Sequence, residues 1–427
     1  MDDARECRIG MVSTRFAGTD GVSLESAKWA SVLEDLGHEC FYFAGESDRP
    51  AERSHVLPEA HFQHPLIQQI NADLFEGHSR SPATSELVQD LRRTIKNALH
   101  AFVREKQLEL LIVENALSLP MNVPLGLAIT ELVSETRIPT IAHHHDFAWE
   151  RSRYTVHAAN DYLQAAFPPA MAEMAHVVLN SYAAHELARR AGLGSTQIPN
   201  VMDFDNPPAA PDGYCRDLRN ALGLEPDEYF LLQPTRVVPR KRIERSIELA
   251  RQIRLPCALV ISHACCDESP DYQKYLREYA DVMGVRLIFA GDLFSQARGR
   301  TPADAKIYSL HDAYFMADLV TYPSSIEGFG NAFLEAIYYR KPLVMSSYDT
   351  FIADIEPMGF NVIEFGEFIT DATVQQVRRA LEDPASYSDS VERNYRLARK
   401  HFSYTSLRHD LEALFEMLPS RLPPRTT

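Results

Sequence analysis

The chain has 427 residues, 45% hydrophobic and 24% charged, which is long enough for two or three domains of ordinary globular composition. Its 43 basic and 59 acidic residues give a formal net charge of −16, which argues against a nucleic-acid partner and against an anionic membrane surface. The sequence has no apolar stretch near the roughly 18 residues of a membrane span, no signal-peptide pattern and no CxxC pair. We therefore expect a cytoplasmic protein without stable membrane insertion.

The first half of the chain alternates strand-like and helix-like segments. The apolar runs that predict strands are 7–12, 39–46, 109–116, 138–145 and 175–181. A helix is predicted over 23–38, and its apolar side chains at helical spacing are Leu24, Ala27, Ala30, Leu33 and Leu36. Strands that alternate with helices indicate parallel βαβ units.

The alternation weakens over the proline-rich stretch 198–215, which is typical of a linker, and then restarts. The strands predicted after it are 229–235, 257–263, 285–291, 318–324 and 342–347, and the helices are 241–254 and 271–283. We predict the α/β class, with two doubly wound Rossmann-like domains that face each other across a cleft. The predicted boundaries are 1–205, 206–400, and a segment 401–427 whose amphipathic helix packs back on the first domain.

A tight glycine turn flanked by two acids opens the helical sequence EGFGNAFLEA. Glu327 precedes the turn, and Glu335 lies roughly one and a half turns into the helix. At the carboxyl end of a parallel strand, free helix N–H groups favour a phosphate, and Gly328 and Gly330 permit close backbone approach. The two acids would then accept hydrogen bonds from hydroxyls on either side, as in a nucleotide sugar. The alternative is an ordinary helix start with one solvated acid.

Two cations follow the strand 229–235, Arg236 in the loop and Lys241 at the start of the next helix. Basic groups at a helix N-terminus oppose its dipole, so a bound anion would rationalise them. An arginine fork and a lysine point charge suit a diphosphate. The alternative is a solvated basic helix start.

Three consecutive histidines, His143, His144 and His145, end the strand 138–145. His143 and His145 point to one face of a strand, and such a His-x-His pair could bind zinc. The spacing marks no third ligand, so the alternative is that His143 and His144 are supporting or core residues.

Polar residues that follow two strands of the first domain are candidates for binding a polar substrate. Arg151 and Arg153 could hold a carboxylate or a phosphate, unless they are simply solvated. Asn115 and Asn122 follow the strand 109–116 at the same sheet edge and are candidate hydroxyl ligands. We predict an acceptor site at this edge.

These segments together resemble the family-4 retaining glycosyltransferases, which have the GT-B architecture. That family has two glutamates separated by seven residues, as Glu327 and Glu335 are. It also has an arginine and a lysine five apart after a strand, as Arg236 and Lys241 are. The segments IPNVMDF and ADLVTYPS are similar to its linker and to one of its strands. The resemblance extends over nearly the whole chain.

The resemblance implies that the second domain binds a nucleoside diphosphate sugar as donor. Arg236 and Lys241 would hold the diphosphate in place of a metal ion, so no metal and no cofactor are expected. Glu327 would contact the donor sugar, Glu335 the ribose, and His145 the primary hydroxyl of the sugar. The other implied donor-binding residues are Gly18, Asp20 and Gly21 of a glycine loop, Asp292 and Leu293 near the base, and Gly328, Phe329, Gly330 and Asn331 at the sugar or phosphate.

The implied function is retaining hexosyl transfer from a donor of the GDP-mannose or UDP-glucose type to a small polar or anionic acceptor in the first domain. Segments 22–38 and 143–151 are similar to the branch that contains mannosylglucosyl-phosphoglycerate synthases and related small-acceptor enzymes. The alternative is a non-catalytic sugar-nucleotide-binding or scaffold protein of the same architecture. A dinucleotide-dependent oxidoreductase is disfavoured because no G-x-G-x-x-G follows the first strand. A homodimer is left open.

Overall fold

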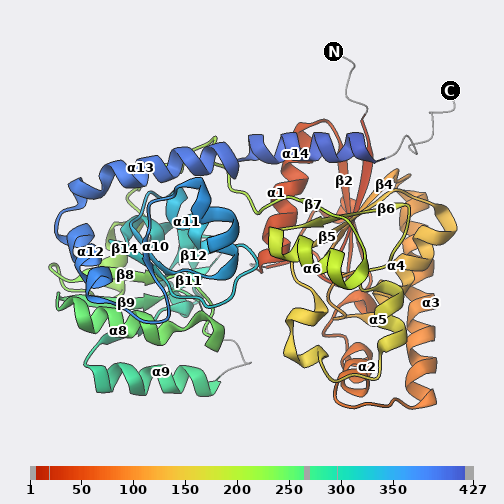
Figure 1. Cartoon of the computed structure of the whole chain (residues 1–427), viewed down its shortest axis with the longest axis horizontal. Coiled ribbons are helices and arrows are strands. Elements are labelled where there is room, and N and C mark those ends of the chain that lie inside the picture. Colours follow the sequence, from red (N-terminus) through yellow and green to blue (C-terminus); the bar gives the residue numbers. More distant parts are fainter. Residues whose placement is uncertain (1–5, 19, 264–269, 296, 419–427) are drawn as a thin grey trace. The chain divides into compact units, whose positions relative to one another are not determined.

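The chain folds into two compact α/β units, each built on one parallel sheet (Figure 1). The computed structural model describes residues 6–18, 20–263, 270–295 and 297–418. Unit 1 contains the chain up to Asn200 and again from Tyr404, and unit 2 contains Val201–Ser403. The predicted class, α/β with two Rossmann-like sheets, is confirmed.

Unit 1 is organised around a 7-stranded parallel sheet. Its strands in spatial order are β3 (Ser54–Val56), β2 (Glu39–Ala44), β1 (Arg8–Val12), β4 (Leu110–Glu114), β5 (Thr140–His144), β6 (Met174–Val178) and β7 (Thr196–Gln197). The order reverses between β1 and β4. Doubly wound sheets bind ligands at the carboxyl ends of the strands beside such a switch point.

Helices cover both faces of this sheet because each strand must cross over to reach its parallel neighbour. The helices are α1 (Gly21–Asp35), α2 (Pro65–Phe75), α3 (Pro82–Glu105), α4 (Val123–Thr136), α5 (Asn160–Ala166), α6 (Ser181–Ala191) and α14 (Tyr404–Met417). Apolar residues of α3 and α4, among them Ile95 and Ile129, pack with β4 in the core. The last helix, α14, contacts α1 within unit 1, whereas residues 419–427 of the predicted terminal segment lie outside the described residues (Figure 1).

The buried face of α1 differs from the predicted one. Its buried residues are Ser23, Glu25, Ser26, Trp29, Ala30, Val32 and Leu33. Leu24, Ala27 and Leu36 are only partly buried. The predicted stripe is confirmed at Ala30 and Leu33 only. The face turned to the core also carries Trp29, whose ring stacks on His143, and Glu25, which is paired with Lys28.

Unit 2 is organised around a 6-stranded parallel sheet. Its strands in spatial order are β10 (Arg286–Phe289), β9 (Cys257–Ile261), β8 (Tyr229–Gln233), β14 (Leu319–Tyr322), β15 (Leu343–Ser346) and β16 (Ile363–Phe365). A 3-stranded sheet has the order β11 (Phe294–Ser295), β13 (Lys306–Ser309) and β12 (Gly299–Arg300). The large sheet reverses its order between β8 and β14, which places the switch point there.

The helices of unit 2 flank the 6-stranded sheet, and their apolar faces form its core. They are α7 (Leu218–Ala221), α8 (Ile243–Ile253), α9 (Pro270–Met283), α10 (Leu310–Met316), α11 (Asn331–Tyr338), α12 (Asp371–Glu382) and α13 (Pro384–His401). None of the helices in the described ranges is both long and apolar enough to cross a membrane.

The strands that the apolar runs predict all form, with ends that move by one to a few residues. The strands that were not predicted include β3, β7 and β16, which lie at sheet edges and have two or three residues each. Such short strands carry no periodic pattern, because a period of two needs several residues to show.

The first prediction concerns Gly45, at the end of β2. A Cβ atom added there would lie 2.1 Å from the backbone nitrogen of His61, so neither backbone can stay in place. We expect Gly45→Ala to lower the free energy of unfolding by about 1–3 kcal/mol in urea unfolding of the full chain. Gly194→Ala is the control, because a Cβ there meets nothing within 4 Å, and it should change stability by less than about 0.5 kcal/mol. Equal stability of the two variants would contradict the fold at this point.

Candidate active site

The loops that leave β8 and β14 meet at the switch point of unit 2. Ser325, after β14, donates two hydrogen bonds to the carbonyl oxygen of Arg240, after β8, from its backbone nitrogen at 3.0 Å and its hydroxyl at 3.1 Å. The structure therefore brings the predicted cation segment and the predicted glycine turn side by side.

A buried ion pair joins these two loops. Nζ of Lys241 contacts Oε1 of Glu327, and Nη1 of Arg240 lies 3.3 Å from Oε2 of the same carboxylate. The side chains of Lys241 and Glu327 are each 10% exposed. Burial disfavours the ionised Glu327, but the charges of Lys241 and Arg240 outweigh it and hold the pKa of Glu327 below its ordinary value.

The loop that follows β15 holds the glycine turn through two side-chain hydrogen bonds. The Tyr348 hydroxyl donates to the carbonyl of Phe329 at 2.6 Å, and the Thr350 hydroxyl donates to the carbonyl of Glu327 at 3.0 Å. Gly330 has φ +120°, and a Cβ added to it would lie 2.3 Å from the Tyr348 hydroxyl. The turn therefore requires glycine at 330 for two independent reasons.

Helix α11 begins at Asn331, directly after this turn, and carries Glu335. The buried Tyr314 of α10 donates a hydrogen bond of 2.6 Å to Oε2 of Glu335. Gly328 and Asn331 are half-buried beside the turn. The N-terminus of α11 and the carboxylates of Glu327 and Glu335 therefore belong to one region of unit 2.

Arg236 is the exposed cation of this region. It follows β8, and its side chain forms no ion pair with any other described residue. His263, after β9, is affected by it, because burial and then the charges of Arg236 and Lys241 lower the pKa of His263 to about 4. Asp292 and Leu293 follow β10 in a short turn, where Asp292 is exposed and Leu293 is half-buried.

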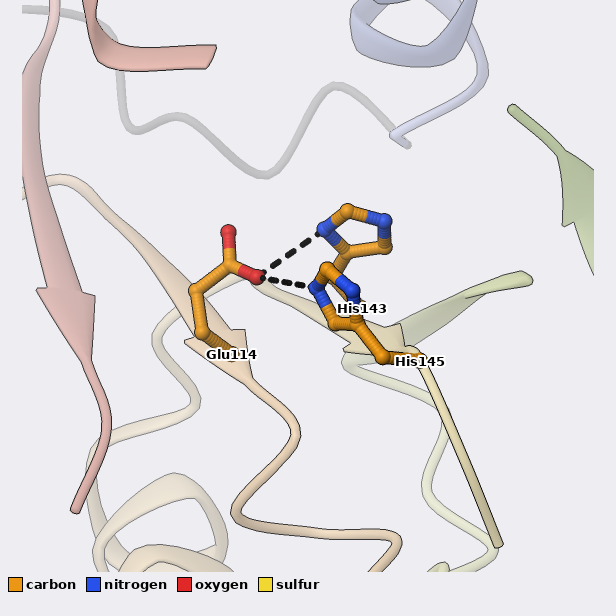
Figure 2. A group of neighbouring side chains, drawn as sticks. All are labelled: Glu114, His143 and His145. Atoms are coloured by element: carbon orange, nitrogen blue, oxygen red, sulfur yellow. Dashed lines mark hydrogen bonds and ion pairs between the residues drawn. The ribbon is translucent and has the colours of Figure 1, made fainter. Parts of the chain in front are cut away.

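A second cluster lies at the carboxyl ends of β4 and β5 in unit 1 (Figure 2). Glu114 and His143 are register partners on these strands, and His145 follows two residues later on the same side. Oε2 of Glu114 lies 3.0 Å from Nδ1 of His143 and 3.0 Å from Nε2 of His145. Figure 2 shows both imidazoles turned toward the one carboxylate.

The charges of Glu114 and His145 support each other, whereas burial lowers the pKa of His143. Burial disfavours the Glu114 carboxylate, but His143 and then His145 outweigh it and bring the pKa of Glu114 to about 2. Burial likewise disfavours a charged His145, yet the hydrogen bond and the charge of Glu114 raise the pKa of His145. Glu114 is therefore ionised at neutral pH.

His144 points to the other face of the sheet. Its Nε2 lies 2.9 Å from Nδ1 of His176 on β6, and both rings are buried. Burial and the neighbouring histidines lower the pKa of His144 well below its ordinary value. His144 and His176 are thus core residues, as the alternative interpretation of His144 predicts.

The side chains of Asn115 and Asn122 form hydrogen bonds within unit 1. The Asn115 side-chain oxygen accepts hydrogen bonds from the backbone nitrogens of His145 and Asp146, at 3.0 and 3.2 Å. Asn122 is buried and caps α4, because its side-chain oxygen accepts from Leu125 at 3.0 Å. These contacts use the side-chain oxygens of both residues, and the role of Asn115 and Asn122 as hydroxyl ligands stays a prediction.

The predicted arginines remain available. Arg151 lies 2.6 Å from Asp146 and keeps a side-chain exposure of 35%. Arg153 is exposed, with its guanidinium 4.6 Å from the centre of the Tyr154 ring.

The predicted glycine loop of unit 1 is a helix cap. Asp20 caps α1 by accepting from the backbone nitrogens of Val22 and Ser23, each at 3.1 Å. Gly21 is exposed and begins the helix. Gly18 has φ +76° and donates its N–H to Asp48 at 3.0 Å. The Gly18 amide is therefore already engaged by a carboxylate.

Sequence reasoning missed several residues of these clusters. Arg240 adjoins Lys241 in a run of cations, and Glu114 ends an apolar strand, so both carried a signal that could have been used. Tyr314, Tyr348 and Thr350 carried none, because only the fold brings them to the acids and the turn.

Comparison with known proteins identifies the family. Residues 297–397 match the model of the family described as glycosyl transferases group 1, and the similarity to individual proteins covers nearly the whole chain. The chain belongs to the group 1 glycosyl transferases.

Two relatives and one solved structure show what the chain is similar to. The chain is 32% identical to mannosylglucosylglycerate synthase of Thermotoga maritima, over 96% of this chain and 100% of that protein. It is 32% identical to mannosylglucosylglycerate synthase of Petrotoga mobilis, over 84% of this chain and 86% of that protein. Among solved structures, HepE of Anabaena in complex with UDP-glucose has 15% identity and a TM-score of 0.66, over 96% and 100% of the two chains. This last likeness shows the shared GT-B fold.

The second prediction tests the buried ion pair. Lys241→Met keeps the aliphatic stem but leaves the Glu327 carboxylate with Arg240 alone, so we expect a loss of about 3–5 kcal/mol of stability in urea unfolding. Adding Glu327→Gln should recover part of this loss, because it removes the unpaired buried charge. A double variant less stable than Lys241→Met, or a single variant as stable as the unmodified chain, would contradict the pairing.

Proposed function

We propose that the chain transfers a mannosyl group from a nucleoside diphosphate sugar, GDP-mannose in the first instance, to glucosylglycerate. The observation that carries the proposal is the cationic group at the switch point of unit 2, directly beside the glycine turn. The product that two relatives are named for supports this sugar and this acceptor. Glucosylglycerate is a small anionic molecule, as the sequence analysis expects of the acceptor.

In this proposal the diphosphate lies against Arg236 and Lys241, with the N-terminus of α11 as a further donor of N–H groups. Arg236 is exposed and has no ion pair with a described residue, so its fork is open to a phosphate. Lys241 carries three N–H donors and can serve a phosphate without leaving Glu327. Three cations, Arg236, Arg240 and Lys241, outnumber the carboxylates of Glu327 and Glu335 and make this region favourable for an anion.

Glu327 and Glu335 bind the hydroxyls at the two ends of the donor. Glu327 accepts from the sugar, since it precedes the turn, and Glu335 accepts from the ribose, where Tyr314 already fixes one of its oxygens. In unit 1, Nε2 of His145 faces Glu114, so Nδ1 is the ring atom that would bind a sugar hydroxyl. Asp292 and Leu293 flank the base.

The proposed reaction proceeds with retention. The acceptor hydroxyl attacks the anomeric carbon on the face from which the diphosphate leaves, and the departing phosphate oxygen takes the hydroxyl proton. The protein holds the partners close and stabilises the charge that develops on the leaving group, which Arg236 and Lys241 do without a metal ion. Arg153 or Arg151 holds the carboxylate of the acceptor.

The direct test is transfer itself. We expect the full chain, mixed with GDP-mannose and glucosylglycerate, to release GDP and to form a product whose new linkage keeps the anomeric configuration of the donor by NMR. UDP-glucose is the second donor to assay. Nucleotide binding without release of nucleoside diphosphate, with either donor, would favour the non-catalytic binding protein instead.

The third prediction concerns Arg236, which is a cleaner probe than Lys241 because its side chain is exposed and its removal leaves no buried carboxylate unpaired. Arg236→Gln should weaken GDP binding by about 10- to 100-fold, the loss of a charge-assisted hydrogen bond, with no change in thermal midpoint. Arg251→Gln, an exposed arginine on α8, is the matched control and should bind GDP normally. Equal affinities of the two variants would contradict the diphosphate role.

The fourth prediction uses His263 as a reporter. NMR titration of its ring in the free chain should give a pKa near 4. Bound GDP should raise that pKa by about one unit, because the diphosphate offsets the charges of Arg236 and Lys241. Arg236→Gln should reduce the shift. A pKa that GDP leaves unchanged would place the diphosphate elsewhere.

A further inference from the structure

We propose that Glu114, His143 and His145 of unit 1 form a binding site for a divalent first-row transition metal ion, with zinc as the best match. The site goes beyond the proposed function, which needs no metal at the diphosphate. The spacing of the histidines in the sequence marks no third ligand for the His-x-His pair. That ligand comes from the neighbouring strand β4.

The backbone sets the geometry. Because β4 and β5 pair in register at Glu114 and His143, the carboxylate and the His-x-His pair share one side of the sheet edge (Figure 2). One ligand atom from each of the three residues lies within 4.8 Å of the others, and Oε2 of Glu114 is 3.0 Å from each imidazole. Zinc bonds of about 2.0–2.1 Å place tetrahedral ligand atoms roughly 3.3 Å apart, and the two 3.0 Å contacts of Oε2 are already near that spacing.

Unpartnered buried atoms point to a ligand. Nδ1 of His143 and Oε1 of Glu114 are buried, and neither has a hydrogen-bond partner among the described residues. Nδ1 of His143 lies 3.0 Å from Oε2 of Glu114, but this contact does not meet hydrogen-bond geometry. Nδ1 therefore does not use its hydrogen-bonding direction in the ring plane for that contact. Leaving such atoms unsatisfied is costly, and a metal ion between the two rings and Oε2 of Glu114 would satisfy Nδ1 of His143.

The surroundings suit a cation. Trp29 of α1 stacks on His143 with ring centres 4.2 Å apart, which fixes the imidazole plane. Two neutral imidazoles and one carboxylate leave one positive charge on a divalent ion. The negative charge of the fully buried Glu25 favours positive charge at both rings. Of the three ligands only His145 keeps exposed surface, 7% of its side chain, which leaves the fourth position on that side.

The ligand types select the metal. Two imidazole nitrogens and one carboxylate oxygen suit zinc and other first-row ions better than calcium or magnesium, which prefer oxygen. An ion held there would also fix the orientation of His145 and leave its Nδ1 outside the coordination sphere. Binding would release any proton carried by the imidazoles.

The experiment measures metal directly, without any substrate. The untagged full chain is stripped with chelator, dialysed against Zn²⁺ and analysed by mass spectrometry, and Co²⁺ is added separately to record its visible spectrum. We expect about one zinc per chain, a rise in thermal midpoint with Zn²⁺, and the strong visible absorption of four-coordinate cobalt. Glu114→Gln and His143→Gln should each weaken zinc binding at least about tenfold.

His176→Gln is the matched control, since it removes a buried imidazole of the same sheet that is not a ligand, and it should keep the zinc. The proposal is overturned if the unmodified chain retains no zinc, or if Glu114→Gln binds zinc as tightly as the unmodified chain. If a variant fails to fold, the cobalt spectrum of the unmodified chain decides, and a spectrum of hydrated six-coordinate cobalt overturns the site. Loss of transferase activity alone, with zinc retained, bears only on the proposed function.

Discussion

The buried contact between Lys241 and Glu327 is the interaction on which the geometry of unit 2 depends. It ties the loop after β8 to the turn after β14, across the point where the sheet reverses its strand order. Burying two charges costs free energy that their attraction repays only when the geometry is good, so such a pair adds little to stability. The ion pair instead fixes the positions of the groups around it. Glu327, the turn at Gly330 and the start of α11 all take their places from it and from the Tyr348 hydroxyl beneath them.

The chain has a formal charge of −16, yet the proposed function requires a site that binds an anionic diphosphate. Lys241 is largely committed to Glu327, whereas Arg236 stands exposed on the neighbouring loop. A local excess of cations in an acidic protein attracts an anionic ligand to one place and leaves the rest of the surface repulsive. Under the function proposed here, Lys241 holds Glu327 and also meets the diphosphate, and the exposed Arg236 meets the diphosphate beside it.

Much of the fold followed from the sequence because apolar runs and helical spacing are local signals. Apolar runs predict most strands of the two large sheets, and they predict the helices α8 and α9. The spacing of Arg236, Lys241, Glu327 and Glu335 indicated the region that the fold brings together. What could not be predicted depends on contacts between distant segments. Glu114 reaches the histidines only because β4 pairs with β5, and Trp29 turns α1 so that Glu25 is buried. Asn122 also caps α4, a contact that its place after the strand 109–116 did not indicate.

Under the proposed function, the diphosphate of a nucleotide sugar binds at the switch point of unit 2, and a crystal structure of the chain with GDP decides whether it does. We expect phosphate oxygens about 2.7–3.2 Å from the Arg236 guanidinium and from Nζ of Lys241, with the N-terminus of α11 facing them. A nucleotide bound away from the loops after β8 and β14, with Arg236 still facing solvent, would refute the diphosphate site.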